Sequence, residues 1–308
     1  MTLYRLDEWA RALDPAIDAA TLGAARAGYA LICVGPAAPS FAQLAERSLA
    51  LAAADQSEVL FDRFGRVAAY VSYAWLDAGA ERHLLRHGVT SALAAAPRSG
   101  ERLWLLDFAA FDGAVRAVLA TLQGQVFAAA DCAGYFRYKG GRRIGKMVGR
   151  AEIGARCGDG AAPTEPAARA QAAFPNYAHG AHALLDMAIL LGQCMALAHA
   201  GGQFAGLSAA QVQRRLWTPL SLQQYRLYRD ADGHPTGLVT WAWLDNAALA
   251  RRADDPLHEL APETWNAGTV RCVADVLASA AQADVIDADY AGTLRYHAGA
   301  DRPHQEAA

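Results

Sequence analysis

The spacing of apolar and polar positions predicts a chain that alternates helices with short strands. Apolar side chains recur at helical spacing over residues 7–27 and 40–54, and Ser40 stands where the second helix needs an N-cap. Two shorter apolar stretches, 59–61 and 67–75, flank a turn whose glycine falls where a hairpin needs a positive φ. The front of the chain therefore predicts two helices followed by two antiparallel strands.

The stretch 103–106 is a short apolar run that follows a turn and ends on a single acid, Asp107. This pattern is typical of a buried strand that presents a carboxylate at its C-terminal end. Such a carboxylate can orient a base or act on an amine, and it can equally cap a turn or pair with an arginine. Asp107 is therefore a candidate catalytic residue.

The chain contains the same pattern twice. The segment VSYAWLD at 71–77 returns as VTWAWLD at 239–245, and the same spacing places Asp275 opposite Asp107. The second copy predicts helices and strands in the same order, with helices over 181–200 and 208–217 and strands over 222–229, 237–243 and 269–275. Mixed strands and helices with hairpins at the front predict an α+β fold, an α/β three-layer domain present twice.

A stretch rich in glycine, proline and alanine, 154–175, predicts a linker between the copies. We therefore expect a first domain over 1–153 and a second over 176–308. The chain has 308 residues, of which 54% are apolar, and this is enough for two domains with cores of their own.

Composition excludes several classes of function. A net charge of −3 gives no whole-molecule case for nucleic-acid binding. The five cysteines form no CxxC pair, which favours buried thiols in a reducing compartment over a disulfide framework or a zinc site. The most apolar stretch, 184–200, carries Asp186, Gln193 and His199, so no membrane span is expected. The N-terminus is acidic and amphipathic, unlike a signal peptide, and a cytoplasmic protein is predicted.

Two histidines and one basic run are further candidates. His83 and His87 are four residues apart, which on a helix places both imidazoles on one face, as in a metal or haem site; a solvated helix end is the alternative. The basic run comprises Arg137, Lys139, Arg142, Arg143 and Lys146. It is either a solvated face or a dock for an acidic or phosphate-bearing partner.

Several of these blocks resemble one known family. The segments VSYAWL at 71–76, SGERLWLLDF at 99–108 and FDG at 111–113 look like the core of the toxin-activating lysine acyltransferases, which acylate RTX haemolysins. The second half resembles the same family over 219–230 and 239–244. The resemblance implies GNAT-like domains that transfer a fatty acyl group from acyl-carrier protein to a lysine, with no cofactor required.

The resemblance also assigns residues. Asp107 and Asp275 match the family's catalytic Asp, whereas the family's catalytic His falls at Phe41 in the first copy and Phe204 in the second. Because members of the family pair as dimers, two fused copies imply an internal pseudo-dimer.

Three functions stay open. The first is an acyltransferase acting on an amine of a peptide or small molecule, its base replaced by His199, Asp107 or the substrate. The second is a repurposed protein that binds a hydrophobic ligand in pockets lined by Phe41, Phe204, Trp104 and His199. The third is an enzyme that uses His83 or His87 to hold a metal or haem.

Overall fold

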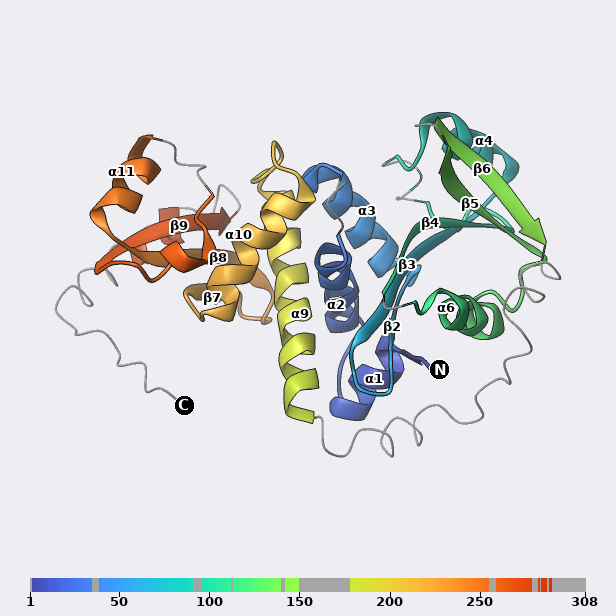
Figure 1. Ribbon diagram of the computed structural model, residues 1–308, viewed down its shortest axis with the longest axis horizontal. Helices are drawn as coiled ribbons and strands as arrows, with labels where there is room; N and C mark the ends of the chain where they lie inside the picture. Colours follow the sequence, from blue (N-terminus) through green and yellow to red (C-terminus); the bar gives the residue numbers. More distant parts are fainter. Residues whose placement is uncertain are drawn as a thin grey trace. The chain divides into compact units, whose positions relative to one another are not determined.

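The computed structural model (Figure 1) describes residues 2–34, 39–90, 93, 96–111, 113–139, 142–149, 178–254, 259–278, 282, 284–286 and 288–289. The chain divides into two compact units. The first comprises Met1–Ala196 and Ala205–Gln213, and the second Leu197–Phe204 and Arg214–Ala308. This division differs from the domain boundaries predicted from the repeat, which stay a prediction. The predicted linker, 154–175, lies outside the described residues.

The first unit contains a six-stranded sheet in which the strands follow one another in chain order. Its strands are β1 (Tyr4–Arg5), β2 (Ser57–Phe61), β3 (Val67–Leu76), β4 (Arg102–Ala110), β5 (Cys132–Lys139) and β6 (Arg142–Gly149). Neighbouring strands are antiparallel except β4 and β5, which are parallel. The predicted hairpin is β2–β3. The strand predicted to end on Asp107 is β4, but it continues to Ala110 because Phe108 to Ala110 still pair with β3, so Asp107 lies within the strand and not at its end.

Helices cover both faces of this sheet. They are α1 (Leu6–Leu13), α2 (Ala19–Ile32), α3 (Phe41–Ala53), α4 (Ala78–His87), α6 (Val115–Thr121) with a π-helical turn (Leu122–Val126), and α9 (Ala178–Ala200). The predicted helix over 7–27 is two helices, because Pro15 disfavours helical backbone at Asp14 and the carboxylate of Asp18 caps α2 at the Thr21 N–H.

Side chains of β2 alternate between two cores. Val59 and Phe61 pack with α1, α2 and the described part of α9, whereas Leu60 packs with α6 and the π-helical turn on the opposite face. The first copy is therefore a three-layer α+β domain. Val126 ends the π-helical turn, and Phe127 follows it within this second core.

Helices α2 and α9 cross at unusually short distance within the first unit. A Cβ added at Gly28 would lie 1.8 Å from the Ala188 carbonyl oxygen, and one added at Gly192 would lie 1.9 Å from that of Ala24. Glycine at both positions is what permits this approach. Among the described helices, α9 is long and apolar enough over Ala183–Ala200 to cross a membrane by length and composition alone; here its N-terminal part packs against α2.

The second copy repeats the order of the first. Its described elements are α10 (Ala209–Ser221), β7 (Tyr225–Arg229), β8 (Pro235–Leu244), α11 (Asn246–Asp254), a 3₁₀ turn (Pro262–Thr264) and β9 (Val270–Ala278). Strands β7, β8 and β9 form a three-stranded antiparallel sheet. Each begins 168 residues after its counterpart, from 57 to 225, 67 to 235 and 102 to 270. The predicted tandem α+β architecture is confirmed.

Candidate functional site

A cavity of about 840 Å³ opens in the first unit where β4 and β5 separate. These parallel strands pair only at Leu103 with Ala133 and at Trp104 with Gly134. Beyond those positions, residues of both strands line the cavity. The lining residues are Pro39, Gln43, Arg47, His87, Gly88, Val89, Leu105, Leu106, Asp107, Phe108, Val115, Leu119, Gln123, Phe127, Ala130, Cys132, Ala133, Tyr135, Phe136, Arg143 and Val148.

The lining combines an apolar part with a charged part. The apolar part includes Leu119 and Phe127 of the α6 region, and the exposed rings and methyls of Phe108 and Val115. The charged part includes the guanidinium of Arg47. A cavity of this kind can hold an apolar chain that carries a polar head group.

Both carboxylate oxygens of Asp107 are engaged. Arg47 Nη2 donates to Oδ1 at 2.8 Å, and the hydroxyl of Ser72 donates to Oδ2 at 2.5 Å. The Arg47 Nε atom is buried and has no hydrogen-bond partner among the described residues. The side chains of Arg47 and Asp107 are 17% and 28% exposed, so this pair reaches solvent through the cavity.

The second copy contains the same pair in a closed environment. Arg215 donates through Nε to both oxygens of Asp275, at 2.8 and 2.9 Å, and each side chain is 7% exposed. Burial raises the pKa of Asp275, and the Arg215 guanidinium opposes this rise. Thr240 stands where Ser72 does, but its Oγ1 is buried without a hydrogen-bond partner among the described residues.

A β-bulge accompanies the aspartate in each copy. Ser72 lies opposite Asp107, and the register shifts directly after it; Thr240 lies opposite Asp275, and the register shifts at the same point. A bulge re-aims the side chains around it. Its recurrence shows that both copies hold the aspartate by the same distortion of the sheet.

Comparison with known families shows to which family the chain belongs. The RTX toxin acyltransferase family, HlyC, matches residues 37–148 and, separately, residues 184–296. The chain belongs to this family. The Arg47–Asp107 pair lies in the first matched region and the Arg215–Asp275 pair in the second, and the predicted tandem duplication is confirmed. No curated protein matches the chain.

Two of the residues expected to form a pocket in this family member lie in the core instead. Phe41 is 1% exposed at the start of α3. Trp104 is 1% exposed, donates from Nε1 to Glu81 at 3.0 Å and stacks obliquely on Phe136. Neither lines the cavity, although Trp104 holds the strand pair at the point where the cavity begins.

The expectation that Phe41 and Phe204 occupy equivalent positions in the two copies is wrong. Helix α10 begins 168 residues after α3, so the counterpart of Phe41 is Ala209. Phe204 lies in the preceding turn with φ 63°, and the Arg215 guanidinium lies 5.5 Å from its ring centroid. When the two copies are aligned by these helices, Phe204 therefore lies five positions before the counterpart of Phe41. His199 is exposed on α9 and does not line the cavity.

The basic run is divided between β5 and β6. Arg137 and Arg143 are exposed and Lys146 is half-buried, while the side chains of Lys139 and Arg142 lie outside the described residues. Arg143 alone among the five lines the cavity, with its guanidinium 4.6 Å from the ring centroid of Phe136.

The two histidines of α4 have different surroundings. Their ring centroids are 4.7 Å apart, His83 Nε2 is 3.0 Å from the Thr90 hydroxyl, and His87 lines the cavity. Among the described residues, neither belongs to a group of three metal-ligating side chains. A metal or haem at this pair stays a prediction.

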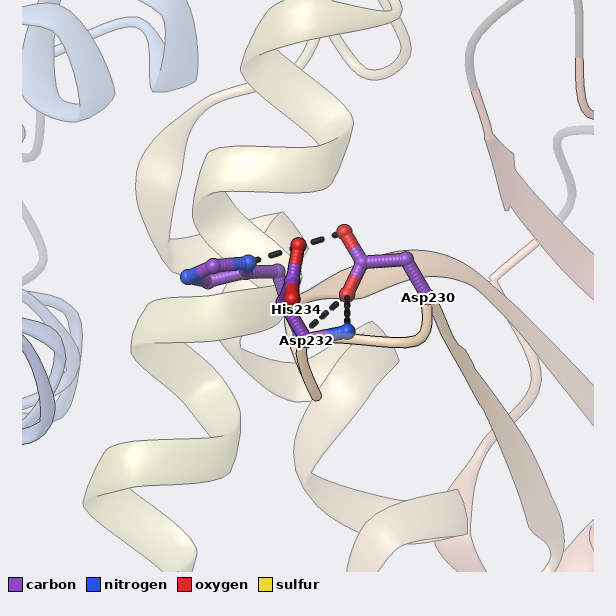
Figure 2. A group of neighbouring side chains, drawn as sticks. All are labelled: Asp230, Asp232 and His234. Carbon is purple, nitrogen blue, oxygen red and sulfur yellow. Dashed lines mark hydrogen bonds and ion pairs between the residues drawn. The ribbon is translucent and has the colours of Figure 1, made fainter.

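Asp230, Asp232 and His234 form a cluster of three possible metal ligands at the β7–β8 turn (Figure 2). All three are exposed. Asp230 Oδ1 accepts from the N–H groups of Asp232 and His234, as Asp62 accepts from Phe64 and Arg66 in the first copy. The arrangement is therefore explained by the repeated hairpin turn.

Arg47 and Ser72 are the site residues that sequence reasoning missed, since they lie on α3 and β3, outside the segment that contains Asp107. The signal that identifies them is the repeat itself, because Arg47 recurs as Arg215, and Ser72 recurs conservatively as Thr240, at the spacing that relates Asp107 to Asp275.

Proposed function

We propose that this family member is an N-acyltransferase that takes a fatty acyl group from acyl-carrier protein and transfers it to an amine of a peptide or small molecule. The observation that carries the proposal is the apolar cavity at the opening between β4 and β5. Its lining suits an acyl chain, and the Arg47–Asp107 pair lies on its wall.

The opening between the strands also suits the donor's arm. Beyond Trp104, β4 keeps its pairing with β3 but has no strand partner on the β5 side among the described residues. The amide groups of a phosphopantetheine arm can bind the backbone N–H and C=O groups exposed there, as a peptide adds to a sheet edge. A GNAT-like domain is the fold that this arrangement supports.

Asp107 acts here by positioning Arg47. Because the carboxylate accepts one hydrogen bond from Arg47 and another from Ser72, it holds the guanidinium at the cavity wall. A cation placed there stabilises negative charge that develops on the thioester oxygen during attack. The exposed Arg137 and Arg143 and the half-buried Lys146 supply positive charge for docking an acidic carrier protein.

The internal pseudo-dimer belongs to the same proposal. Within the first unit, Ser40 forms an antiparallel bridge with Ser208, its own counterpart in the second copy. The N–H of Phe41 donates to the Leu207 carbonyl, and the N–H of Ala209 donates to that of Pro39. Contacts that are reciprocal between counterparts are what an isologous, two-fold pairing requires.

Acyl-carrier protein loaded with a labelled fatty acyl group, incubated with the protein and an amine-bearing peptide, tests the proposal. We expect an amide product in the mass spectrum and free carrier thiol in equal amount. Narrowing the cavity by Leu119→Trp should suppress transfer of long chains more than of short ones. No acyl-carrier binding and no product would contradict the proposal.

The alternative is a binding protein that uses the same cavity for a hydrophobic ligand. The observation in its favour is the apolar part of the lining, which includes Leu119 and Phe127 together with the exposed side chains of Phe108 and Val115. In that case, the acyl group should bind in the cavity and be recovered from it unchanged.

A further inference from the structure

An amine that attacks a thioester must give up a proton, so the cavity needs a group that accepts one. Asp107 is poorly placed for this, because Arg47 and Ser72 already occupy both of its oxygens. Among the residues that line the cavity, His87 is the one with an imidazole, the side chain best suited to proton transfer near neutral pH.

The local backbone presents His87 to the cavity. Helix α4 ends at His87, and the Gly88 N–H closes its last turn on the Leu84 carbonyl. Gly88 has φ 79°, a backbone conformation that favours glycine. The chain therefore turns directly after His87, and His87, Gly88 and Val89 form one wall together.

His83, one turn earlier on the same helix, shows what distinguishes His87. Its Nε2 lies 3.0 Å from the Thr90 hydroxyl, and it does not line the cavity. The ring of His87 contacts that of His83, but neither of its nitrogens makes a hydrogen bond to a described residue. The imidazole of His87 is therefore open to a substrate in the cavity.

We propose that His87 is the general base of the acyl transfer, an inference that rests on the proposed function. The amine nitrogen attacks the thioester carbonyl carbon while its proton passes to His87. The carbon–sulfur bond then breaks, and the departing thiolate takes the proton from the imidazolium. Thioester and amine become amide and thiol, and His87 returns to its starting state.

The test compares His87→Ala with the matched control His83→Ala in the acyl-transfer assay. Loss of a general base costs about 10²- to 10⁴-fold in kcat. We expect that loss for His87→Ala, with donor affinity retained, and a rate within about twofold of the parent for the control. Added imidazole should restore part of the rate of His87→Ala, which it does not do for a purely structural defect. His87→Gln, which keeps a polar side chain, should be as inactive as His87→Ala.

The outcomes separate the two proposals. Transfer by the parent protein that survives His87→Ala and His87→Gln would overturn the role of His87 and leave the proposed function standing. Donor binding without any transfer by the parent protein would overturn both. A rate that falls without rescue by imidazole, together with a lowered melting temperature, would make His87 structural.

Discussion

The two copies each contain an Arg–Asp ion pair at the same position, but in different surroundings. Arg47–Asp107 is partly exposed at a cavity, whereas Arg215–Asp275 is sealed in its copy and uses the guanidinium Nε as well. A paired charge that reaches solvent can exchange its partners for a substrate. A buried pair is kept together because its separation would leave a charge in the interior without its counter-ion.

Replacing each aspartate by asparagine should separate these roles. Asp275→Asn removes the carboxylate charge that Arg215 faces at a site where both side chains are 7% exposed, and the expected loss in the free energy of unfolding is about 3–5 kcal/mol. Asp107→Asn should cost about 1 kcal/mol, because its pair is partly screened by solvent. Urea denaturation of the two variants measures the difference, and equal losses would contradict it.

Ser72 and Thr240 allow a second matched comparison. Ser72→Ala removes a hydrogen bond to a carboxylate and should destabilise the protein by about 1.5–3 kcal/mol. Thr240→Val removes a buried hydroxyl without a partner among the described residues and should be neutral or stabilising. Thermal unfolding decides the point, and a large loss for Thr240→Val would show that its hydroxyl has a role in the folded state.

At the scale of elements, the crossing of α2 and α9 depends on two glycines. A side chain at Gly28 meets the backbone of Ala188, which has little freedom to move, whereas a Cβ at Gly23 on the same helix has its nearest neighbour at 4.0 Å. The two positions differ in packing rather than in helix propensity.

Gly28→Ala should therefore destabilise the protein by about 1–3 kcal/mol through overpacking. Gly23→Ala should stabilise it by about 1 kcal/mol, since alanine is the better helix former and meets no clash. Both shifts can be measured as changes in denaturation midpoint. Stabilisation by Gly28→Ala would mean that the crossing is looser than described.

Local signals allowed most elements to be predicted from the sequence. The Ser40 cap, the glycine of the β2–β3 turn and the repeat located α3, the hairpin and β7–β9 to within a few residues. The parallel pairing of β4 with β5 and the bulge after Ser72 depend on contacts distant in sequence, and a one-residue change in register moves side chains to the other face. The partners of Asp107 could therefore not be read from its own segment.

At the scale of the whole chain, the repeat and the packing assign α9 differently. By sequence it opens the second copy, but Leu185 and Ala188 belong to the core that α1, α2 and β2 form in the first unit. Helix α9 thus belongs to the second copy by sequence, but its Leu185 and Ala188 are buried in the core of the first unit.

Proteolytic cleavage within 154–175 should consequently leave the two fragments bound together. The C-terminal fragment carries the Leu185 and Ala188 side chains and Gly192, which complete the core of the N-terminal one. Co-elution in gel filtration under native conditions is the expected result. Release of a folded N-terminal fragment of 1–153 would contradict it.

The position of α9 also has a consequence during synthesis. The strands of the first sheet are complete once Gly149 is made, yet the compact unit they belong to extends to Gln213. At about 5–20 residues per second, the ribosome needs several seconds to supply the missing part. Until α9 is made, the surface of α2 around Gly28 lacks the helix that packs on it, and we expect a chaperone to protect the nascent chain there.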